Sequence, residues 1–277
     1  MPTAPYDRIG GAYDSTRRAD SYIVSRLLAH LNPQESGRYL DVACGTGNYT
    51  LAFASAGVKV VGVDNSPRMV AAAARKASPT PVGGSGFAGG EGERDVPEWA
   101  VADVTRLPFP SASFAGASCT LALRYFADLD AAIAELGRVV GAGPIVLFTA
   151  TPEQIRRYWL RAYFPETVER TASQAYSIGR ITDALRAAGF SRVQTEPYAV
   201  KPDLEDLFLY SGKHRPSLYL SPAIRAGMWS FANLAPPSEE TAGCAELRRD
   251  VESGKVGDVV AQCDDRLGDY LFVVAER

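Results

Sequence analysis

The stretch of sequence that decides the fold is Tyr39-Leu40-Asp41-Val42-Ala43-Cys44-Gly45-Thr46-Gly47-Asn48. It predicts a strand, a glycine turn and the start of a helix, and the next apolar run, residues 58–63, ends in Asp64. Gly45 and Gly47 allow the backbone to turn sharply and to approach a ligand that a side chain would exclude. Such a unit places a nucleotide at the carboxyl ends of parallel strands, where Asp64 can accept hydrogen bonds from both hydroxyls of a ribose.

The order of residues in the glycine turn distinguishes between two kinds of nucleotide. A dinucleotide fingerprint has the form Gly-x-Gly-x-x-Gly, because a pyrophosphate needs backbone amides and a closely packed helix. Here Thr50 stands in place of the third glycine, and the acidic Asp41 lies four residues before the first. A carboxylate at that place would repel a pyrophosphate and suits a ligand that carries positive charge. The turn therefore disfavours a nicotinamide oxidoreductase.

Composition and charge narrow the class of protein. The chain has 277 residues, 46% of them hydrophobic, enough for one large domain or a domain with a cap. Its formal net charge is −3 and no basic block stands out, which argues against a nucleic-acid partner. No apolar stretch reaches the roughly 18 residues of a membrane helix, and the first residues lack a secretory signal. We therefore expect a cytoplasmic protein with no membrane partner, and the scattered cysteines and two histidines predict no metal site.

The spacing of apolar runs predicts the architecture. Strands alternate with helices through the central part of the chain, which is typical of an α/β, Rossmann-like fold with a mostly parallel sheet and helices on both faces. Seven strands are expected, at about residues 38–43, 58–63, 99–102, 114–119, 144–149, 192–200 and 270–275. Helical segments on either side of the sixth strand predict a helical cap inserted around it.

The chain is expected to divide into four parts. These are an N-terminal helical lid (1–35), a nucleotide-binding core (36–150), a helical substrate cap (151–177 and 201–260), and the remainder of the sheet (178–200 and 268–277). One insert, residues 77–92, is rich in Gly and Pro and has the composition of a flexible loop. We expect it at the amino end of the sheet, remote from a ligand at the carboxyl end.

Four motifs between residues 37 and 150 resemble those of class I S-adenosylmethionine-dependent methyltransferases, in the order and spacing of that family. The glycine turn resembles the first motif, Asp/Glu-x-Gly-x-Gly-x-Gly, with Ala43 where the family usually has glycine, a difference of one methyl group. Residues 61–69 resemble the second motif, Val-x-Gly-x-Asp-x-Ser-x-x-Met, and residues 102–109 the third, Asp-Ala-x-x-Leu-Pro-Phe. Residues 138–140 match the segment before the fifth strand. Segments near both ends of the chain resemble the small-molecule branch of the family.

The resemblance implies a site for S-adenosyl-L-methionine, with S-adenosyl-L-homocysteine as the product. In the family, the counterpart of Asp64 holds the ribose and that of Asp103 accepts from the adenine amino group. Arg17 or Arg18 is expected to pair with the methionyl carboxylate, and we assign Arg18; alternatively, both arginines are solvated at a helix start. The residues expected to bind the cofactor are Tyr13, Arg18, Asp41, Ala43, Cys44, Gly45, Gly47, Asp64, Asn65, Met69, Ala102, Asp103, Val104, Thr120 and Leu121.

The methyl acceptor is expected just beyond the fourth strand, at residues 121–126. Members of the family often carry His-His or Asn-His where this chain has Arg124 and Tyr125. Arg124 could neutralise an acidic acceptor and Tyr125 could orient it; alternatively, Tyr125 packs in the core and Arg124 extends to water. Tyr13, from the lid, and His214, from the cap, complete the catalytic candidates, although a histidine in such a segment can also be simply exposed.

The function predicted from these motifs is methyl transfer from S-adenosylmethionine to a small-molecule acceptor, at oxygen, nitrogen or carbon. A carboxylate acceptor would need no general base, which fits a site poor in histidine and containing Arg124. Two alternatives remain open. One is another enzyme that uses the same cofactor, for cyclisation or decarboxylation, and the other is a non-catalytic regulator that has kept the pocket.

Overall fold

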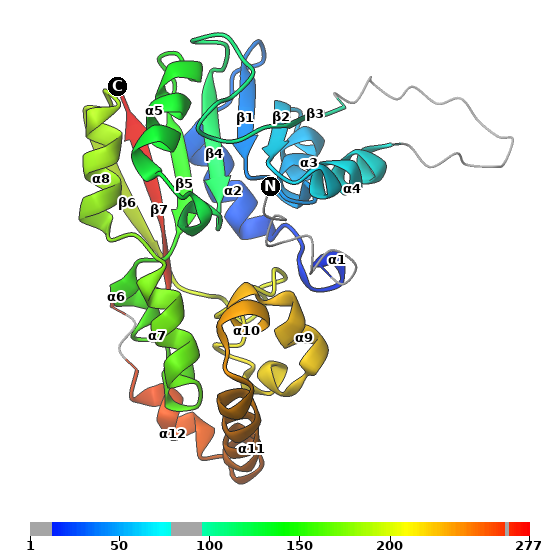
Figure 1. The fold of residues 1–277 in the computed structure, drawn as a ribbon, viewed down its shortest axis with the longest axis vertical. Helices are drawn as coiled ribbons and strands as arrows, with labels where there is room; N and C mark the ends of the chain where they lie inside the picture. Colours follow the sequence, from blue (N-terminus) through cyan, green and yellow to red (C-terminus); the bar gives the residue numbers. More distant parts are fainter. Residues whose placement is uncertain (1–12, 79–95, 264–265) are drawn as a thin grey trace, which may run out of the picture.

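A seven-stranded sheet forms the centre of the protein in a computed structural model that describes residues 13–78, 96–263 and 266–277 (Figure 1). The strands follow the order β3-β2-β1-β4-β5-β7-β6, and all are parallel except β7, which is antiparallel to β5 and β6. They are β1 (Arg38–Val42), β2 (Lys59–Asp64), β3 (Glu98–Val101), β4 (Gly116–Thr120), β5 (Ile145–Thr149), β6 (Arg192–Tyr198) and β7 (Tyr270–Glu276). The predicted Rossmann-like α/β fold is confirmed.

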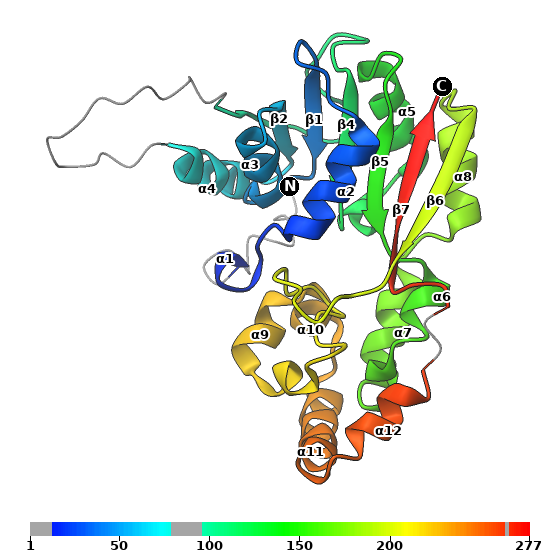
Figure 2. The same cartoon turned by 180° about the vertical axis from the view of Figure 1, so that it is seen from behind.

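Helices cover both faces of this sheet. Helix α2 (Ser21–Leu31) and α3 (Asn48–Ser55) pack on one face, where α2 buries Ile23 and Leu27. Helices α5 (Leu129–Val139) and α8 (Ile178–Ala187) pack on the other, so that α5 and α8 are in front in Figure 1 and α2 is in front in Figure 2. The remaining core helix, α4 (Pro67–Ala77), lies against β2 and β3.

Side-chain caps stabilise the first turns of two helices. The Ser66 hydroxyl accepts a hydrogen bond from the Met69 N–H at 3.3 Å, and Pro67 occupies the first turn of α4. The Asp20 carboxylate caps α2 in the same way, accepting from the Ile23 N–H at 3.0 Å. These caps orient both helices against the sheet.

The helical cap lies beyond the carboxyl ends of the parallel strands (Figures 1 and 2). Its helices are α6 (Pro152–Ile155), α7 (Pro165–Ser173), α9 (Pro222–Gly227), α10 (Trp229–Leu234), α11 (Pro237–Ser253) and α12 (Val256–Ala261), with short 3-10 turns at Trp159–Ala162 and Pro216–Leu220. The first part of the predicted helical cap, residues 151–177, does not form one continuous helix, because Pro165 starts a new helix. Its aromatic side chains, Tyr158, Trp159, Tyr163 and Phe164, are buried in the interior of the cap.

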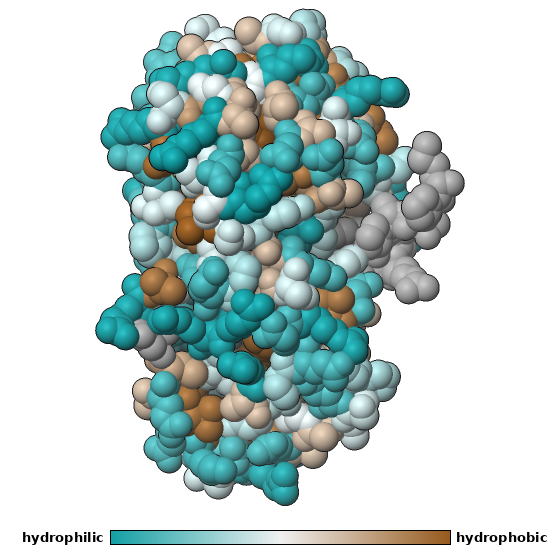
Figure 3. Space-filling view, turned by 60° about the vertical axis from the view of Figure 1, so that its left-hand side comes forward, coloured by the Kyte–Doolittle hydropathy of each residue, from teal (hydrophilic) through white to brown (hydrophobic). Residues whose placement is uncertain are grey.

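Two expected elements fall wholly or largely outside the described residues. They are the first part of the N-terminal lid, residues 1–12, and most of the Gly-rich insert, since residues 79–95 are not described. In the parts that are described, no helix combines the length and hydropathy needed to cross a bilayer. The face drawn in Figure 3 is largely hydrophilic, with hydrophobic side chains in small separate patches.

Candidate active site

The glycine turn follows β1 at the point where the strand order reverses. Strand β1 pairs with β2 on one side and β4 on the other, both in parallel, so a crevice opens at their carboxyl ends. The turn takes positive φ angles at Ala43 (54°), Gly45 (56°) and Gly47 (77°). A Cβ on Gly47 would lie 2.4 Å from the Trp99 ring, so both the backbone angle and the packing require glycine there.

Asp64 is held rigidly at the end of β2. Its Oδ2 accepts the Gly45 N–H at 2.9 Å, and its Oδ1 accepts the Ser66 N–H at 2.9 Å. Two backbone donors from two different loops thus fix the orientation of the carboxylate. The carboxylate faces the main cavity of the protein.

This cavity has a volume of about 480 Å³, enough for a nucleoside-sized ligand and part of a second molecule. Twelve of the sequence-predicted site residues line it: Ala43, Gly45, Asp64, Asn65, Met69, Ala102, Asp103, Val104, Thr120, Leu121, Arg124 and Tyr125. They lie at the carboxyl ends of β1, β2, β3 and β4 or in the segments that follow these strands, so the carboxyl ends of four parallel strands form the floor of the cavity. The structure therefore brings most of the predicted site together.

Asp41 and Cys44 line a smaller adjoining cavity of about 40 Å³. The Asp41 carboxylate is 1% exposed and accepts hydrogen bonds from the Thr50 hydroxyl at 2.6 Å and the Ser118 hydroxyl at 3.1 Å. Burial raises the pKa of Asp41 to about 6, although the two hydroxyls oppose the shift. Burial also raises the pKa of the Cys44 thiol, which therefore stays protonated at neutral pH.

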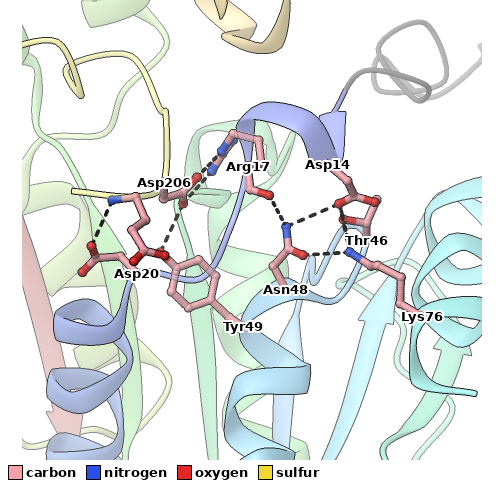
Figure 4. Close-up of polar contacts among 9 residues, drawn as sticks. Asp14, Arg17, Asp20, Thr46, Asn48, Tyr49, Lys76 and Asp206 are labelled. Atoms are coloured by element: carbon pink, nitrogen blue, oxygen red, sulfur yellow. Dashed lines mark hydrogen bonds and ion pairs between the residues drawn. The ribbon is translucent and has the colours of Figure 1, made fainter. Parts of the chain in front are cut away.

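Arg17, rather than the predicted Arg18, reaches the cavity. Arg18 is exposed, whereas Arg17 lines both cavities and forms a two-pronged ion pair with Asp206, at 2.5 and 3.1 Å (Figure 4). The reason is the direction of the chain before α2, which turns Arg17 inward between the sheet and the cap. For Tyr13, the other lid candidate, the side chain lies outside what the structure describes.

The far wall of the cavity belongs to the cap. Tyr125 packs edge to face against Trp229, with ring centroids 4.9 Å apart, and the Arg124 guanidinium lies 5.6 Å from the centre of the Tyr125 ring. The cap residues that complete this wall are Phe208, Leu209, Met228, Trp229 and Ser230. None of them was predicted from the sequence, because no local motif marks a residue that reaches the site only through tertiary folding.

His214 is not brought to this site. Its Nε2 lies 2.8 Å from the Val200 carbonyl oxygen, and the residue lines a separate cavity of about 180 Å³ between the cap and the residues just before β7. The segment after β6 turns away from the sheet before it reaches His214, which places the imidazole elsewhere. Over the described ranges, no group of three or more His, Cys, Asp or Glu side chains is arranged to hold a metal ion.

The fold and the site together define a nucleotide-binding α/β enzyme. Its crevice has a carboxylate, Asp64, beside a glycine turn. The chain is a class I S-adenosylmethionine-dependent methyltransferase, and the family described as a methyltransferase domain matches residues 40–148. The site residues fit the cofactor: the Asp64 carboxylate is preoriented, and Gly45 brings a backbone with no side chain to the cavity. Gly47, also predicted for the site, packs against Trp99 instead and does not line the cavity. S-adenosylmethionine is thus the cofactor of this family and of this chain.

Comparisons with known proteins agree with this assignment. A solved structure of a putative methyltransferase from an antibiotic biosynthesis pathway of Anabaena variabilis is 28% identical, with a TM-score of 0.80, over 95% of this chain and 99% of that one. A malonyl-[acyl-carrier protein] O-methyltransferase of Serratia marcescens is 25% identical over 69% of this chain and 72% of its own length. A demethylmenaquinone methyltransferase of Clavibacter sepedonicus is 27% identical over 69% of this chain and 83% of its own length. The Anabaena likeness includes the cap, which the family match does not reach.

Proposed function

We propose that this methyltransferase esterifies a carboxylate on a small acceptor that has an apolar body. The observation that carries the proposal is the composition of the acceptor end: a guanidinium, Arg124, lies beside the Tyr125 ring, which itself packs against Trp229. No histidine lines the main cavity among the described residues. A guanidinium binds a carboxylate through charge and a matching geometry of donors.

The cofactor end of the same cavity is the proposed place of S-adenosylmethionine. Asp64 would accept the ribose hydroxyls, Met69 would pack against the adenine, and the Val104 backbone N–H would donate to the adenine ring. Asp103 would accept from the adenine amino group; its Oδ1 also accepts the Thr105 N–H and hydroxyl, both at 2.8 Å, which holds the carboxylate in place. When bound, the cofactor supplies a methyl group on a positively charged sulfur that departs neutral.

The acceptor residues would contribute by position and charge. A carboxylate is already deprotonated at neutral pH, so no side chain has to remove a proton from it. Arg124 would hold one carboxylate oxygen and leave the other directed at the methyl carbon, while the aromatic wall excludes water. Such positioning can contribute about 7–11 kcal/mol to catalysis. The Serratia relative, by its name, methylates a malonyl group, which is consistent with a carboxylate acceptor.

A second candidate is methylation of an aromatic ring. The aromatic character of Tyr125, Trp229 and Phe208 favours it, as does the similarity to demethylmenaquinone methyltransferases. This reaction would need a group that removes a proton. Asp128 lines the cavity, but its carboxylate already caps α5 by accepting the Ala131 N–H at 3.0 Å. The carboxylate reading requires no such group and is the one we adopt.

The test is a panel of aliphatic and aryl carboxylic acids, their amides, and phenols, each incubated with purified protein and S-adenosylmethionine. We expect release of S-adenosylhomocysteine and a methyl ester, detected by mass spectrometry, with the acids only. Arg124→Met should raise the acceptor KM at least about tenfold, whereas Arg180→Met, which removes an exposed partner of Asp130, should not. Turnover of phenols or amides in preference to acids would contradict the carboxylate proposal. Cofactor binding without turnover would favour a regulator, and cyclised or decarboxylated products without S-adenosylhomocysteine would favour the other alternative.

A further inference from the structure

Asp206 is a cap residue whose carboxylate forms hydrogen bonds with two parts of the chain outside the cap. It is 1% exposed and accepts two N–H groups of Arg17, from the N-terminal segment, and the Tyr49 hydroxyl, from α3, at 3.1 Å (Figure 4). Replacing a buried ion pair by well-packed apolar residues is often neutral for stability. Stability alone therefore gives no reason for this arrangement.

Neighbouring backbone contacts strengthen the connection between residues 14–20 and the cap. The Leu207 N–H donates to the Thr16 carbonyl at 3.0 Å, and the Glu205 N–H donates to the Asp20 carboxylate at 3.3 Å. Thr16 also lies so close to α9 that a Cβ on Gly227 would be 2.1 Å from its Oγ1. Two segments of the cap therefore contact residues 14–20. Each segment continues directly into the cavity wall, one at residues 208–209 and the other at residues 228–230.

The other side of residues 14–20 is bound to the glycine turn. The Asn48 side-chain amide donates to the Arg17 carbonyl at 3.0 Å, and the Asp14 carboxylate accepts the Thr46 hydroxyl at 2.5 Å and the Lys76 ammonium at 2.9 Å (Figure 4). Residues 14–20 therefore lie between the cofactor end and the acceptor wall, with polar contacts to the glycine turn on one side and, on the other, to residues 205–207, which precede the wall residues 208–209. Arg17 itself lines the cavity.

We propose that Asp206 and Arg17 are positioning residues that couple the two ends of the site, so that occupation of the cofactor end fixes the acceptor wall. A ligand beside the glycine turn and Arg17 would stabilise residues 14–20, and these would hold residues 206–209 and 227–230 in place. By thermodynamic linkage, an acceptor that orders the wall would tighten cofactor binding by the same factor. The inference rests on the proposed function only in taking the cap wall as the acceptor site.

The experiment measures binding of S-adenosylhomocysteine by calorimetry and its effect on backbone hydrogen exchange in peptides covering residues 204–210 and 226–232. In the wild-type chain, we expect the ligand to slow exchange in both peptides at least about fivefold. Asp206→Asn keeps the shape but removes the charge; it should still bind the ligand, within about tenfold of the wild-type dissociation constant, and lose the protection in both peptides. Arg17→Lys keeps the charge but loses the paired donors and should give an intermediate protection.

The matched control is Glu240→Gln, which breaks another partly buried ion pair of the cap, with Arg225 at 2.6 Å, without touching residues 14–20. It should keep the full protection. If Asp206→Asn does not fold, the test uses Arg17→Lys instead. Unchanged protection of the two cap peptides in Arg17→Lys would then overturn the proposal. Ligand binding to the wild type with no protection of the cap overturns it too, and leaves the proposed function intact. Failure of the wild type to bind S-adenosylhomocysteine at all would instead overturn the cofactor assignment.

Discussion

At one end of the cavity, the Asp64 carboxylate accepts backbone N–H groups from two adjacent loops, whereas at the other end Tyr125 packs against Trp229 from a distant part of the chain. The first end is made of backbone geometry that a short run of residues determines. The second end is made of side chains that only the packing of the cap brings together. The difference teaches that the proposed cofactor contacts are determined by local sequence, while the wall that we propose for the acceptor depends on tertiary packing.

The largest expected effect is at the local end. Gly47→Ala would place a non-glycine residue at φ 77° and a Cβ 2.4 Å from the Trp99 ring. The backbone angle costs about 1–2 kcal/mol and overpacking about 1–3 kcal/mol more. We therefore expect the free energy of unfolding, measured in urea, to fall by about 2–5 kcal/mol.

Gly57→Ala is the control for this variant, because Gly57 has φ 82° and no atom within 4 Å of an added Cβ. It should lose only the backbone contribution, about 1–2 kcal/mol. Equal losses in both variants would show that the Trp99 packing at the turn is not tight, and would weaken the contrast between the two ends.

The next effect concerns the buried Asp41 carboxylate. Because its pKa is raised to about 6 by burial, the folded state binds this proton more tightly than the unfolded chain does. Its contribution to the free energy of unfolding therefore falls as pH rises from about 4 to about 6, by about 3 kcal/mol. Asp41→Asn cannot titrate, so its stability relative to wild type should rise over that interval, as measured by urea unfolding at several pH values.

Glu196→Gln is a control for the direction of this pH dependence. The hydrogen bond from Arg26 lowers the pKa of Glu196, so its contribution to stability is present above the unfolded pKa and is lost as pH falls. The stability of Glu196→Gln relative to wild type should therefore change with pH in the opposite direction, near pH 4. The same direction in both variants would contradict the assignment of a raised pKa to Asp41.

The same contrast explains what could be predicted from the sequence. The helix that begins after the glycine turn and the acid at the end of β2 are determined within a few residues, and the sequence predicted both correctly. Choosing between Arg17 and Arg18 needed a partner, Asp206, that lies 189 residues away in the chain. No periodicity or spacing carries that information.

The methyl group of Ala43 shows a different limit. A sequence comparison presents the exchange of glycine for alanine as a small change in size. The structure shows that the position has φ 54°, so the change is one of backbone conformation.

The start of strand β4 is another point that the sequence did not predict. The strand begins at Gly116 rather than Phe114, because Phe114 forms an isolated bridge with Val140 instead.

Asp64→Asn should separate the two ends by ligand affinity. It replaces one acceptor oxygen by an amide nitrogen, which donates and cannot accept, so we expect S-adenosylhomocysteine binding to weaken by about 1–3 kcal/mol in calorimetry. Trp229→Leu, at the proposed acceptor end, should change the same dissociation constant by less than about threefold. If Trp229→Leu weakened cofactor binding as much as Asp64→Asn, the two ends would not be separate sites.

The smallest expected effect is at Ala43 itself. An alanine at φ 54° is disfavoured by about 1–2 kcal/mol, whereas glycine adopts that angle freely but loses more entropy on folding, by about 0.5–1 kcal/mol. Ala43→Gly should therefore raise the free energy of unfolding by about 0.5–1 kcal/mol. Ala112→Gly, at φ 55° on an exposed turn, should raise the free energy of unfolding by a similar amount.

Of these two alanines, only Ala43 lines the cavity, so a change in S-adenosylhomocysteine affinity in Ala43→Gly alone would show that the methyl group contacts the ligand. A loss of stability in both variants would mean that neither backbone angle is strained, and the turn would then owe its shape to Gly45 and Gly47.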